Sequence, residues 1–281
     1  MRILLCTDGS EHGQAAVRFG SIIARAASQP ATILGVLEDP KERKLLDRAL
    51  AQGQEWLAGA PAPELKVRHG HAAEEILKET EAGSYDLVVM GARGRRGVTR
   101  FLMGSTAERV ARHSNLPVLI VRGPLDKIER ILICTAAGEP GLAAVEAGGR
   151  LAALLGADAT ELHVMSQVPA TYLSMRDLED LEGQADDLMA HGSREGMHLR
   201  KALGLLADMG VPARARVRHG LVVDEIMDEA CGQGYDMVVI GTHIAAGWMR
   251  FLLEDVTHQL IGCLDRALLV AKAPAGAGQR L

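Results

Sequence analysis

A glycine-rich segment with four arginines is the part of this sequence best suited to bind an anion. It has glycines at positions 91, 94 and 104 and ends in Gly-Ser-Thr, directly before a helical pattern. Glycine lets a backbone approach a phosphate closely, and a helix N-terminus offers free N–H groups and a positive dipole end. Ser105 and Thr106 add hydroxyl donors. The arginines of the segment are Arg93, Arg95, Arg96 and Arg100. The pattern indicates a phosphate-binding loop; the alternative is a glycine-rich turn with a solvated arginine face.

Two familiar phosphate motifs do not describe this segment. A Walker loop needs a lysine before its Ser or Thr, and a dinucleotide fingerprint follows the first strand of its domain. A second candidate is Asp8, which comes directly after the first apolar run, in Thr7-Asp8-Gly9-Ser10. Asp8 could contact a ligand or serve as a helix N-cap or turn residue, and both roles can hold at once.

Apolar runs that alternate with helical patterns must position these residues. We expect strands at 3–7, 32–37, 65–68, 87–91 and 118–121, and helices at 13–27, 41–58, 72–81 and 105–113. Continuous runs of Leu, Ile and Val are typical of strands covered on both faces. Strand and helix in alternation predict a parallel, doubly wound sheet, whose ligands bind at the carboxyl ends of the strands.

The chain contains this unit twice. ILLCT at 3–7 returns as ILICT at 131–135, and VRHG at 67–70 returns at 217–220. The separation between matching residues of the two copies is 128 positions at the first match and 150 at the second. An insertion of about 22 residues in the second copy, between Met165 and Val217, accounts for the difference. We expect this insertion, around Tyr172 to His198, to form a longer connection and a longer helix. The predicted domains are 1–123 and 129–273, joined by a short polar linker.

The loop resembles the G-2x-G-9x-G-[ST] signature of the universal stress protein family, with one family domain per copy. The resemblance implies two tandem doubly wound five-stranded parallel sheets, of strand order 3-2-1-4-5 (adenine nucleotide alpha hydrolase-like), and ATP where that order reverses. By resemblance, Asp8 would contact the nucleotide near its ribose and adenine, and Val36 would pair with adenine through its backbone. Thr7 precedes Asp8 and belongs to the same predicted site. The residues that would hold ribose and phosphates are Met90, Gly91, Arg93, Gly94, Gly104, Ser105 and Thr106.

The second copy has lost these features. Ala136 stands opposite Asp8, and Ile244 stands opposite Gly94. Glu254-Asp255 stands opposite Gly104-Ser105. A carboxylate and a phosphate about 4 Å apart repel by about 1 kcal/mol even in bulk water. We therefore expect ATP in the first copy only, with the second copy a scaffold, a regulatory half or a site for a different ligand.

The composition bears on three further possibilities, namely nucleic-acid binding, membrane insertion and metal binding. The 281 residues are 48% hydrophobic with a net charge of −5, which argues against a general nucleic-acid binder. No apolar run reaches the length of a membrane helix, and the four cysteines show no metal-like spacing. We expect a soluble, cytoplasmic protein with reduced thiols, of which Cys6 and Cys134 lie in the core, and with no bound structural metal. His69 and His219, which match in the repeat, are expected to be strand-end residues before a turn, although a functional pair is the alternative.

The leading hypothesis is a stress-response regulator that binds ATP, with or without Mg²⁺, in its first domain. The alternatives are a nucleotide-free interaction or scaffold protein and a slow ATPase. No catalytic set is evident, because the chain has no nucleophile elbow and no acid–base pair. The resemblance also implies pairing of the two copies through their last strands, dimerisation of whole chains and an unknown protein partner.

Overall fold

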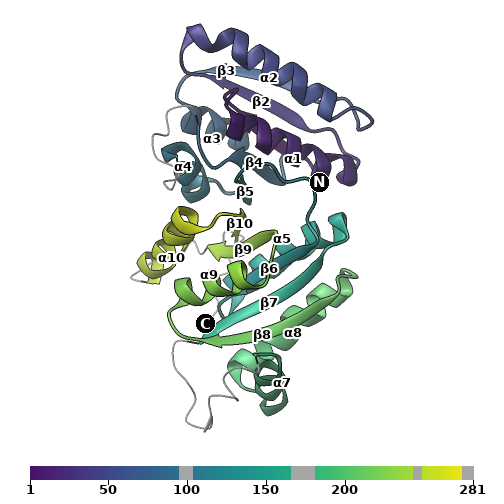
Figure 1. Ribbon diagram of the computed structural model, residues 1–281, viewed down its shortest axis with the longest axis vertical. Helices are drawn as coiled ribbons and strands as arrows, with labels where there is room; N and C mark the ends of the chain where they lie inside the picture. The colour runs from purple at the N-terminus through teal and green to yellow at the C-terminus, as the bar shows by residue number, and fades with distance from the viewer. Residues whose placement is uncertain (95–103, 166–180, 243–248, 274–281) are drawn as a thin grey trace. The chain divides into compact units, whose positions relative to one another are not determined.

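The computed structural model describes residues 1–94, 104–165, 181–242 and 249–273 (Figure 1). It divides into two compact units, Met1–Lys127 with Ile261–Leu269 and Ile128–Leu260 with Val270–Leu281. Three of the loop arginines, Ile244 and the stretch around Tyr172 lie outside the described residues, so the predictions made for them stay untested.

The first repeat alternates strands and helices in the expected order. Its strands are β1 Ile3–Thr7, β2 Thr32–Leu37, β3 Glu64–His69, β4 Leu87–Gly91 and β5 Val118–Val121. Its helices are α1 Glu11–Ala27, the 3-10 turn η1 Pro40–Glu42, α2 Arg43–Trp56, α3 Ala72–Ala82 and α4 Ser105–His113. Helix α1 begins two residues earlier than predicted, because the side chain of Ser10 caps it by accepting a hydrogen bond from the backbone N–H of Gly13.

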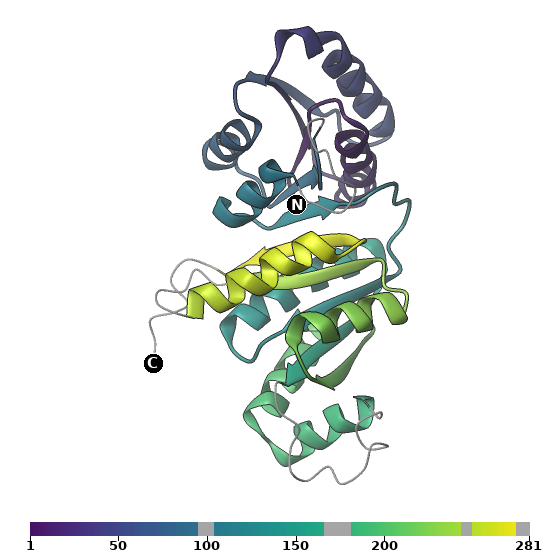
Figure 2. The same ribbon diagram turned by 60° about the vertical axis from the view of Figure 1, so that its left-hand side comes forward.

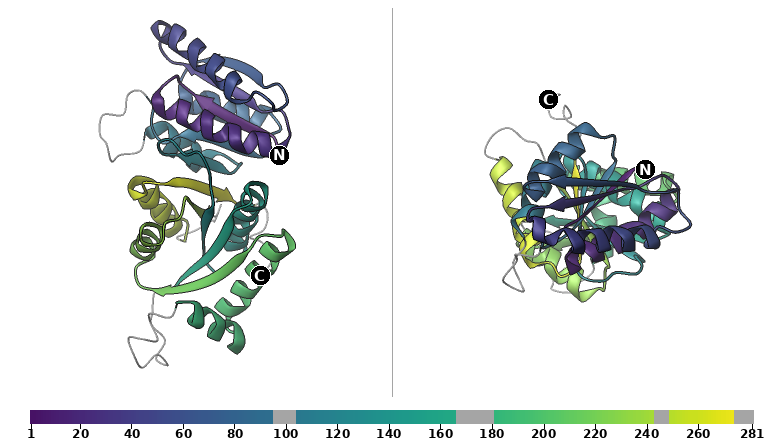
Figure 3. Two further views of the ribbon diagram at one scale, coloured as in Figure 1. Left: turned by 45° about the vertical axis from the view of Figure 1, so that its right-hand side comes forward. Right: turned by 90° about the horizontal axis from the view of Figure 1, so that it is seen from above.

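The strand order of the first repeat is β3-β2-β1-β4-β5, and the paired strands are parallel. Helices α1 and α2 cover one face of the sheet and α3 and α4 cover the other (Figure 3). The chain winds outward from β1 in both directions, so the order reverses between β1 and β4. The predicted doubly wound fold is confirmed, and its switch point lies where β1 and β4 end.

Burial explains why these segments form strands. Every residue of β1, β2, β4 and β5 is buried, whereas the edge strand β3 is exposed or half-buried along its length. Leu5 pairs with Ile33 on one side and Val89 on the other, and none of the three is exposed. Each such side chain contributes roughly 1.5–3 kcal/mol through burial. The sheet therefore gives the strand ends a rigid base.

The second repeat has the same architecture (Figure 2). Its strands are β6 Arg130–Thr135, β7 Asp158–Met165, β8 Ala213–His219, β9 Met237–Thr242 and β10 Ala267–Lys272. Its helices include α5 Glu139–Leu155, α9 Val222–Gly232 and α10 Met249–Cys263. Its strand order, β8-β7-β6-β9-β10, repeats that of the first.

The prediction of one longer helix in the insertion is wrong. The described part of the insertion ends in a separate helix, α7 Leu181–His191, followed by α8 Arg194–Asp208. Helix α8 has 15 residues against 14 in α2, so it is hardly longer than its counterpart. The break comes at Gly192, where φ is +66°, and at Ser193, which caps α8.

Helix α7 adds a small core of its own to the second repeat. Ala185 packs with Leu199 of α8 and Val217 of β8, and all three are buried. The amide oxygen of Gln184, which is also buried, accepts a hydrogen bond from Nε2–H of His219 at 2.7 Å. His219 thus ends its strand, as predicted, and it also docks the inserted helix.

A buried carboxylate recurs in both repeats. Glu79 accepts hydrogen bonds from Tyr85 at 2.8 Å and from Lys66 at 2.8 Å. Glu229, 150 positions later, accepts one from Tyr235 at 3.1 Å and forms a 3.0 Å ion pair with Arg216. Both carboxylates are almost fully buried, at 1% and 0% exposure. The two copies therefore share internal contacts as well as strand order, although their loops have diverged.

Candidate functional site

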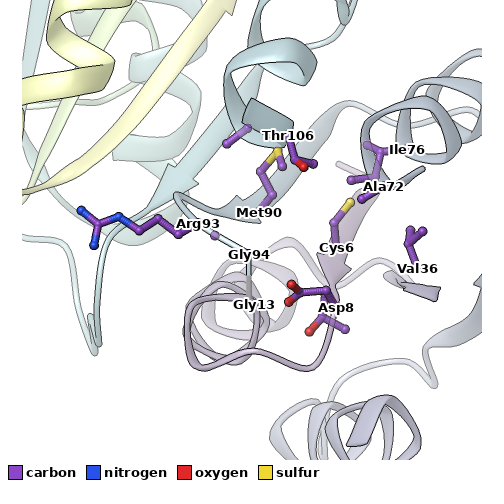
Figure 4. Close-up of a pocket in the computed structure, with 13 residues that line it drawn as sticks. Cys6, Asp8, Gly13, Val36, Ala72, Ile76, Met90, Arg93, Gly94 and Thr106 are labelled. Atoms are coloured by element: carbon purple, nitrogen blue, oxygen red, sulfur yellow. The ribbon is translucent and has the colours of Figure 1, made fainter. Parts of the chain in front are cut away.

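A pocket lies at the switch point of the first repeat (Figure 4). Strand ends of β1, β2 and β4 and the N-terminal turns of α1, α3 and α4 enclose it. Eight of the ten predicted site residues line it: Thr7, Asp8, Val36, Met90, Gly91, Arg93, Gly94 and Thr106.

Asp8 lies at the rim of the pocket, in the turn between β1 and α1. Its Oδ1 accepts a hydrogen bond from the backbone N–H of Ser10 at 3.0 Å. The hydroxyl of Thr7 accepts one from the N–H of Gly9 at 3.1 Å, and Gly9 has a φ of +79°. Asp8 is therefore a turn residue and a pocket residue at once, while Ser10 is the N-cap of α1. The turn fixes the direction in which the Asp8 carboxylate points.

Two glycines, Gly91 at the end of β4 and Gly94 just after it, lie in places where a side chain would not fit without movement. A Cβ at Gly91 would lie 2.5 Å from the carbonyl oxygen of His12, at the start of α1. A Cβ at Gly94 would lie 2.9 Å from Oδ2 of Asp8. The first contact is with backbone and the second with the end of a side chain. Gly91 therefore serves the packing of α1, whereas Gly94 leaves room for the Asp8 carboxylate.

Gly104 and Ser105 are the two predicted residues that do not line the pocket. Gly104 donates a backbone hydrogen bond to the carbonyl of Ala92 at 3.0 Å and is the residue before α4. Ser105 is the first residue of α4 and is exposed. Thr106 and Ala107, one and two residues further on, do line the pocket. The first turn of α4 thus borders the pocket and carries the partial positive charge of a helix N-terminus.

Arg93 lines the pocket, but its side chain extends away from Asp8 and Val36 (Figure 4). In this conformation the guanidinium does not reach the centre of the pocket. Arg95, Arg96 and Arg100 lie outside the described residues. Backbone groups and the α4 N-terminus are consequently the positive elements that the described structure places at the pocket.

Five pocket residues were not predicted. Ala72 and Ile76, one helical turn apart on α3, form an apolar wall together with Val36 (Figure 4). The others are Cys6, Gly13 and Ala107. The i, i+4 spacing of Ala72 and Ile76 directly after the VRHG turn was the available signal. Cys6 is 3% exposed, and burial raises the pKa of its thiol above the usual range, which agrees with the predicted core role.

The second repeat begins the equivalent helix at a different place. Asp255 is the counterpart of Ser105, yet α10 begins at Met249, six residues before Asp255. Glu254 and Asp255 therefore lie within a helix and not at its N-terminus. In the first repeat a glycine-rich turn leads directly into the start of α4, whereas the matching residues of the second repeat lie inside α10. This agrees with the prediction that the second copy has diverged.

Fold and site together define a doubly wound α/β domain with a ligand pocket at its switch point, present in tandem with a diverged second copy. The model of the Universal stress protein family matches residues 1–122 and again residues 127–272. The chain therefore belongs to the universal stress protein family, in its tandem two-domain form.

Individual relatives agree with this assignment. A universal stress protein of Thermus aquaticus, named for its place in the QAH/OAS sulfhydrylase 3' region, is 29% identical over 43% of this chain and 97% of its own length. Universal stress protein MJ0531 of Methanocaldococcus jannaschii is 46% identical over 21% of this chain. The match spans only 35% of that relative's length. A crystal structure of a universal stress protein from Archaeoglobus fulgidus covers 97% of this chain and is covered to 98%, with a TM-score of 0.71 and 18% identity. At this low sequence identity, the similarity shows that the two chains share a fold.

Within the described residues, no helix has both the length and the apolar character needed to cross a membrane.

Proposed function

We propose that the first repeat binds ATP and that the protein acts in the stress response as a nucleotide-linked regulator. The observation that carries this proposal is the convergence of eight predicted residues, from three separate strand ends and a helix start, on one pocket at the switch point. Family membership supports the stress-response part of the proposal.

The pocket has an apolar end and a polar end, which suits a nucleotide. Val36, Ala72 and Ile76 offer a flat apolar wall for a purine base. At the other end, the turn around Gly94 and the first turn of α4 offer backbone N–H groups and a positive dipole to the phosphates. Asp8 lies between the two ends, where its carboxylate would accept hydrogen bonds from ribose hydroxyls. Mg²⁺, where present, would be held mainly by the phosphates, with Asp8 as the nearest carboxylate of the pocket.

The nucleotide that the purified protein retains tests this proposal. Denaturing the freshly purified full chain and separating the released small molecules should give adenine nucleotide at close to one equivalent per chain. An Asp8→Ala preparation should retain much less. If neither preparation releases nucleotide and ATP added at millimolar concentration does not bind, the protein belongs with the nucleotide-free interaction proteins.

Slow ATP hydrolysis is the second candidate function. Its support is Asp8, whose carboxylate lies beside the proposed phosphate turn and could position a metal ion or a water. Positioning and charge neutralisation account for most of phosphoryl transfer, so weak turnover needs no further acid–base pair. Phosphate release with Mg²⁺ present should then fall to background in Asp8→Ala. A rate equal to that of ATP alone in buffer would remove this candidate.

Pairing of the two repeats through their last strands, dimerisation of whole chains, a protein partner and a cytoplasmic location complete the proposal. They follow from the family resemblance and await direct measurement.

A further inference from the structure

The turn that joins β3 to α3 is fastened to the end of β2 at two points. The backbone N–H of Gly70 donates a hydrogen bond to the carbonyl oxygen of Leu37 at 3.2 Å. Two residues further on, the backbone N–H of Ala72 donates to Oε1 of Glu38 at 2.8 Å. Glu38 comes directly after β2, and Ala72 is the first residue of α3. A side chain that lies 34 positions earlier in the sequence therefore holds the start of this helix.

The second repeat has the backbone bond of this pair. Gly220 donates to the carbonyl oxygen of Met165 at 3.0 Å, at the matching positions of the repeat. Helix α9 then begins after Leu221, whose exposed side chain does not cap it. Ser166, which matches Glu38 in sequence, lies outside the described residues and has a shorter, uncharged side chain. A charged cap on this helix is thus a feature of the repeat that has the pocket.

A carboxylate is well suited to the start of α3. The first N–H groups of a helix have no partner within the helix, and the helix N-terminus favours negative charge. His71, the residue before α3, does not cap the helix with its own side chain. Its Nδ1 lies 3.4 Å from the oxygen of Glu38 that accepts from Ala72. Glu38 therefore takes the capping role that the residue before the helix leaves open.

Helix α3 also carries the apolar wall of the pocket. Ala72 and Ile76 line the pocket together with Val36, which belongs to β2 and lies two residues before Glu38 (Figure 4). One part of the wall thus comes from β2 and the other from α3. The hydrogen bond between Ala72 and Glu38 joins these two elements next to the wall.

The far half of α3 has anchors of its own. Glu79, near the C-terminal end of the helix, accepts hydrogen bonds from Lys66 of β3 at 2.8 Å and from Tyr85 at 2.8 Å. Loss of the Glu38 bond should therefore loosen the first turn of α3 and leave the rest of the helix on the sheet.

We infer that Glu38 is a positioning residue for the base of the bound nucleotide, because it keeps Ala72 in the apolar wall. This inference rests on the proposed function, of which it concerns the base-binding end. A chain whose first turn of α3 is open must close it on binding, so the affinity falls with the fraction of closed chains. The phosphate end of the pocket is formed by other elements, the turn around Gly94 and the start of α4.

Hydrogen exchange in the nucleotide-free full chain tests the structural part of the inference. The N–H of Glu75 donates to the carbonyl oxygen of His71 at 3.0 Å, and the matching bond of the second repeat joins Glu225 to Leu221 at 3.0 Å. Glu38→Ala should speed exchange at Glu75 about fivefold, the effect of a lost helix cap, and leave Glu225 unchanged. Equal exchange rates at Glu75 in Glu38→Ala and the wild type would overturn the inference.

Titration with two ligands tests the functional part. ATP carries a base, whereas inorganic tripolyphosphate offers phosphates alone. Glu38→Ala should bind ATP about fivefold more weakly than Glu38→Gln, and the two variants should bind tripolyphosphate equally. Glu38→Gln keeps an oxygen that can accept from Ala72 and lacks the negative charge, as Glu38→Ala does. The comparison therefore removes any effect of charge on the phosphates.

The outcomes separate this inference from the proposed function. A wild-type chain that binds no ATP would contradict the proposed function, and the inference with it. Wild-type binding together with equal ATP affinities in Glu38→Ala and Glu38→Gln would overturn the inference alone. Equal weakening of ATP and tripolyphosphate in Glu38→Ala would also overturn it, because the loss would then not concern the base.

Discussion

The carboxylate of Asp8 and the backbone of Gly94 lie so close that a Cβ at Gly94 would be 2.9 Å from Oδ2 of Asp8. The two residues come from different strand ends, after β1 and after β4. Because the atom in the way is the end of a side chain, a larger residue at 94 would turn the carboxylate aside without disturbing the sheet.

Gly94→Ile, the substitution that the second repeat carries at Ile244, should therefore weaken ATP binding tenfold or more, which is about 1.4 kcal/mol. Its denaturant midpoint should stay close to that of the wild type. Gly204→Ala is the matched control, since a Cβ at Gly204 meets nothing within 4 Å. Equal affinity in Gly94→Ile and wild type would show that the nucleotide does not use Asp8.

A substitution at Gly91, in contrast to one at Gly94, should lower the stability of the fold. A Cβ there would lie 2.5 Å from the carbonyl oxygen of His12, and backbone cannot rotate away. Gly91→Ala should lower the free energy of unfolding by about 1–3 kcal/mol, as overpacking does. Chemical denaturation measures this change, and a stability equal to that of the wild type would mean that α1 does not press on β4 as described.

Two substitutions at Gly104 separate the effect of a side chain's charge on ATP binding from the effect of its size. A Cβ at this position would lie 3.3 Å from Cα of Arg93, a tight contact that small shifts relieve. Gly104→Ala should reduce ATP affinity slightly, whereas Gly104→Glu should abolish binding, because it places a carboxylate at the start of α4 beside the phosphates. Circular dichroism should find both variants folded. Similar affinities for the two variants would mean that the phosphates lie elsewhere.

The buried carboxylate Glu79 predicts a pH-dependent loss of stability. Burial alone would raise its pKa, but hydrogen bonds from Lys66, Tyr85 and Arg68 lower it below the usual value. The cluster therefore stabilises the fold above the carboxyl pKa of the unfolded chain, and that contribution disappears as pH falls through the lowered folded value.

Tyr85→Phe removes one donor and should cost about 1–3 kcal/mol of unfolding free energy at pH 7, and less at acid pH. Tyr235→Phe, the matched change at Glu229, should cost a similar amount at pH 7. Urea denaturation of Tyr85→Phe and the wild type, from pH 7 down to about pH 2, follows the loss through the lowered pKa of Glu79. A loss that stays the same over this whole range would contradict the ionised state assigned to Glu79.

The docking of α7 can be tested with two substitutions on one helix. Ala185 is buried against Leu199 and Val217, whereas Ala190 is exposed. Ala185→Glu should release α7 and make the segment around 181–193 sensitive to protease, because it buries a charge without a partner. Ala190→Glu should behave like the wild type. Equal digestion rates for the two variants would contradict the packing of α7 on β8.

The fold was predictable from sequence because four of the five strands of the first repeat are buried along their whole length. The runs at Thr32–Leu37, Leu87–Gly91 and Val118–Val121 carry side chains suited to burial on both faces, and the structure gives them the predicted bounds. Helix starts were harder to place. Asp8 was the predicted cap candidate, whereas Ser10 caps α1, and the apolar periodicity pointed to a start at Gly13. The prediction of one longer helix in the insertion was wrong, because Gly192 and Ser193 divide that part of the chain into two helices.

The candidate site was predictable where residues follow strands, and less so where helices contribute. Asp8, Val36 and Met90 sit at strand ends, and parallel strands bring their ends to one edge. The i, i+4 spacing places Ala72 and Ile76 on one face of α3, but only the packing of α3 on the sheet turns that face toward the pocket.

Isothermal titration of the full chain with ATP and Mg²⁺ decides whether the first repeat alone binds ATP, because it counts sites as well as measuring affinity. We expect one ATP per chain, with that single site lost in Gly104→Glu and retained in Gly204→Ala. Two equivalents per chain, binding that survives Gly104→Glu, or no heat at millimolar ATP with nucleotide-free protein would contradict it.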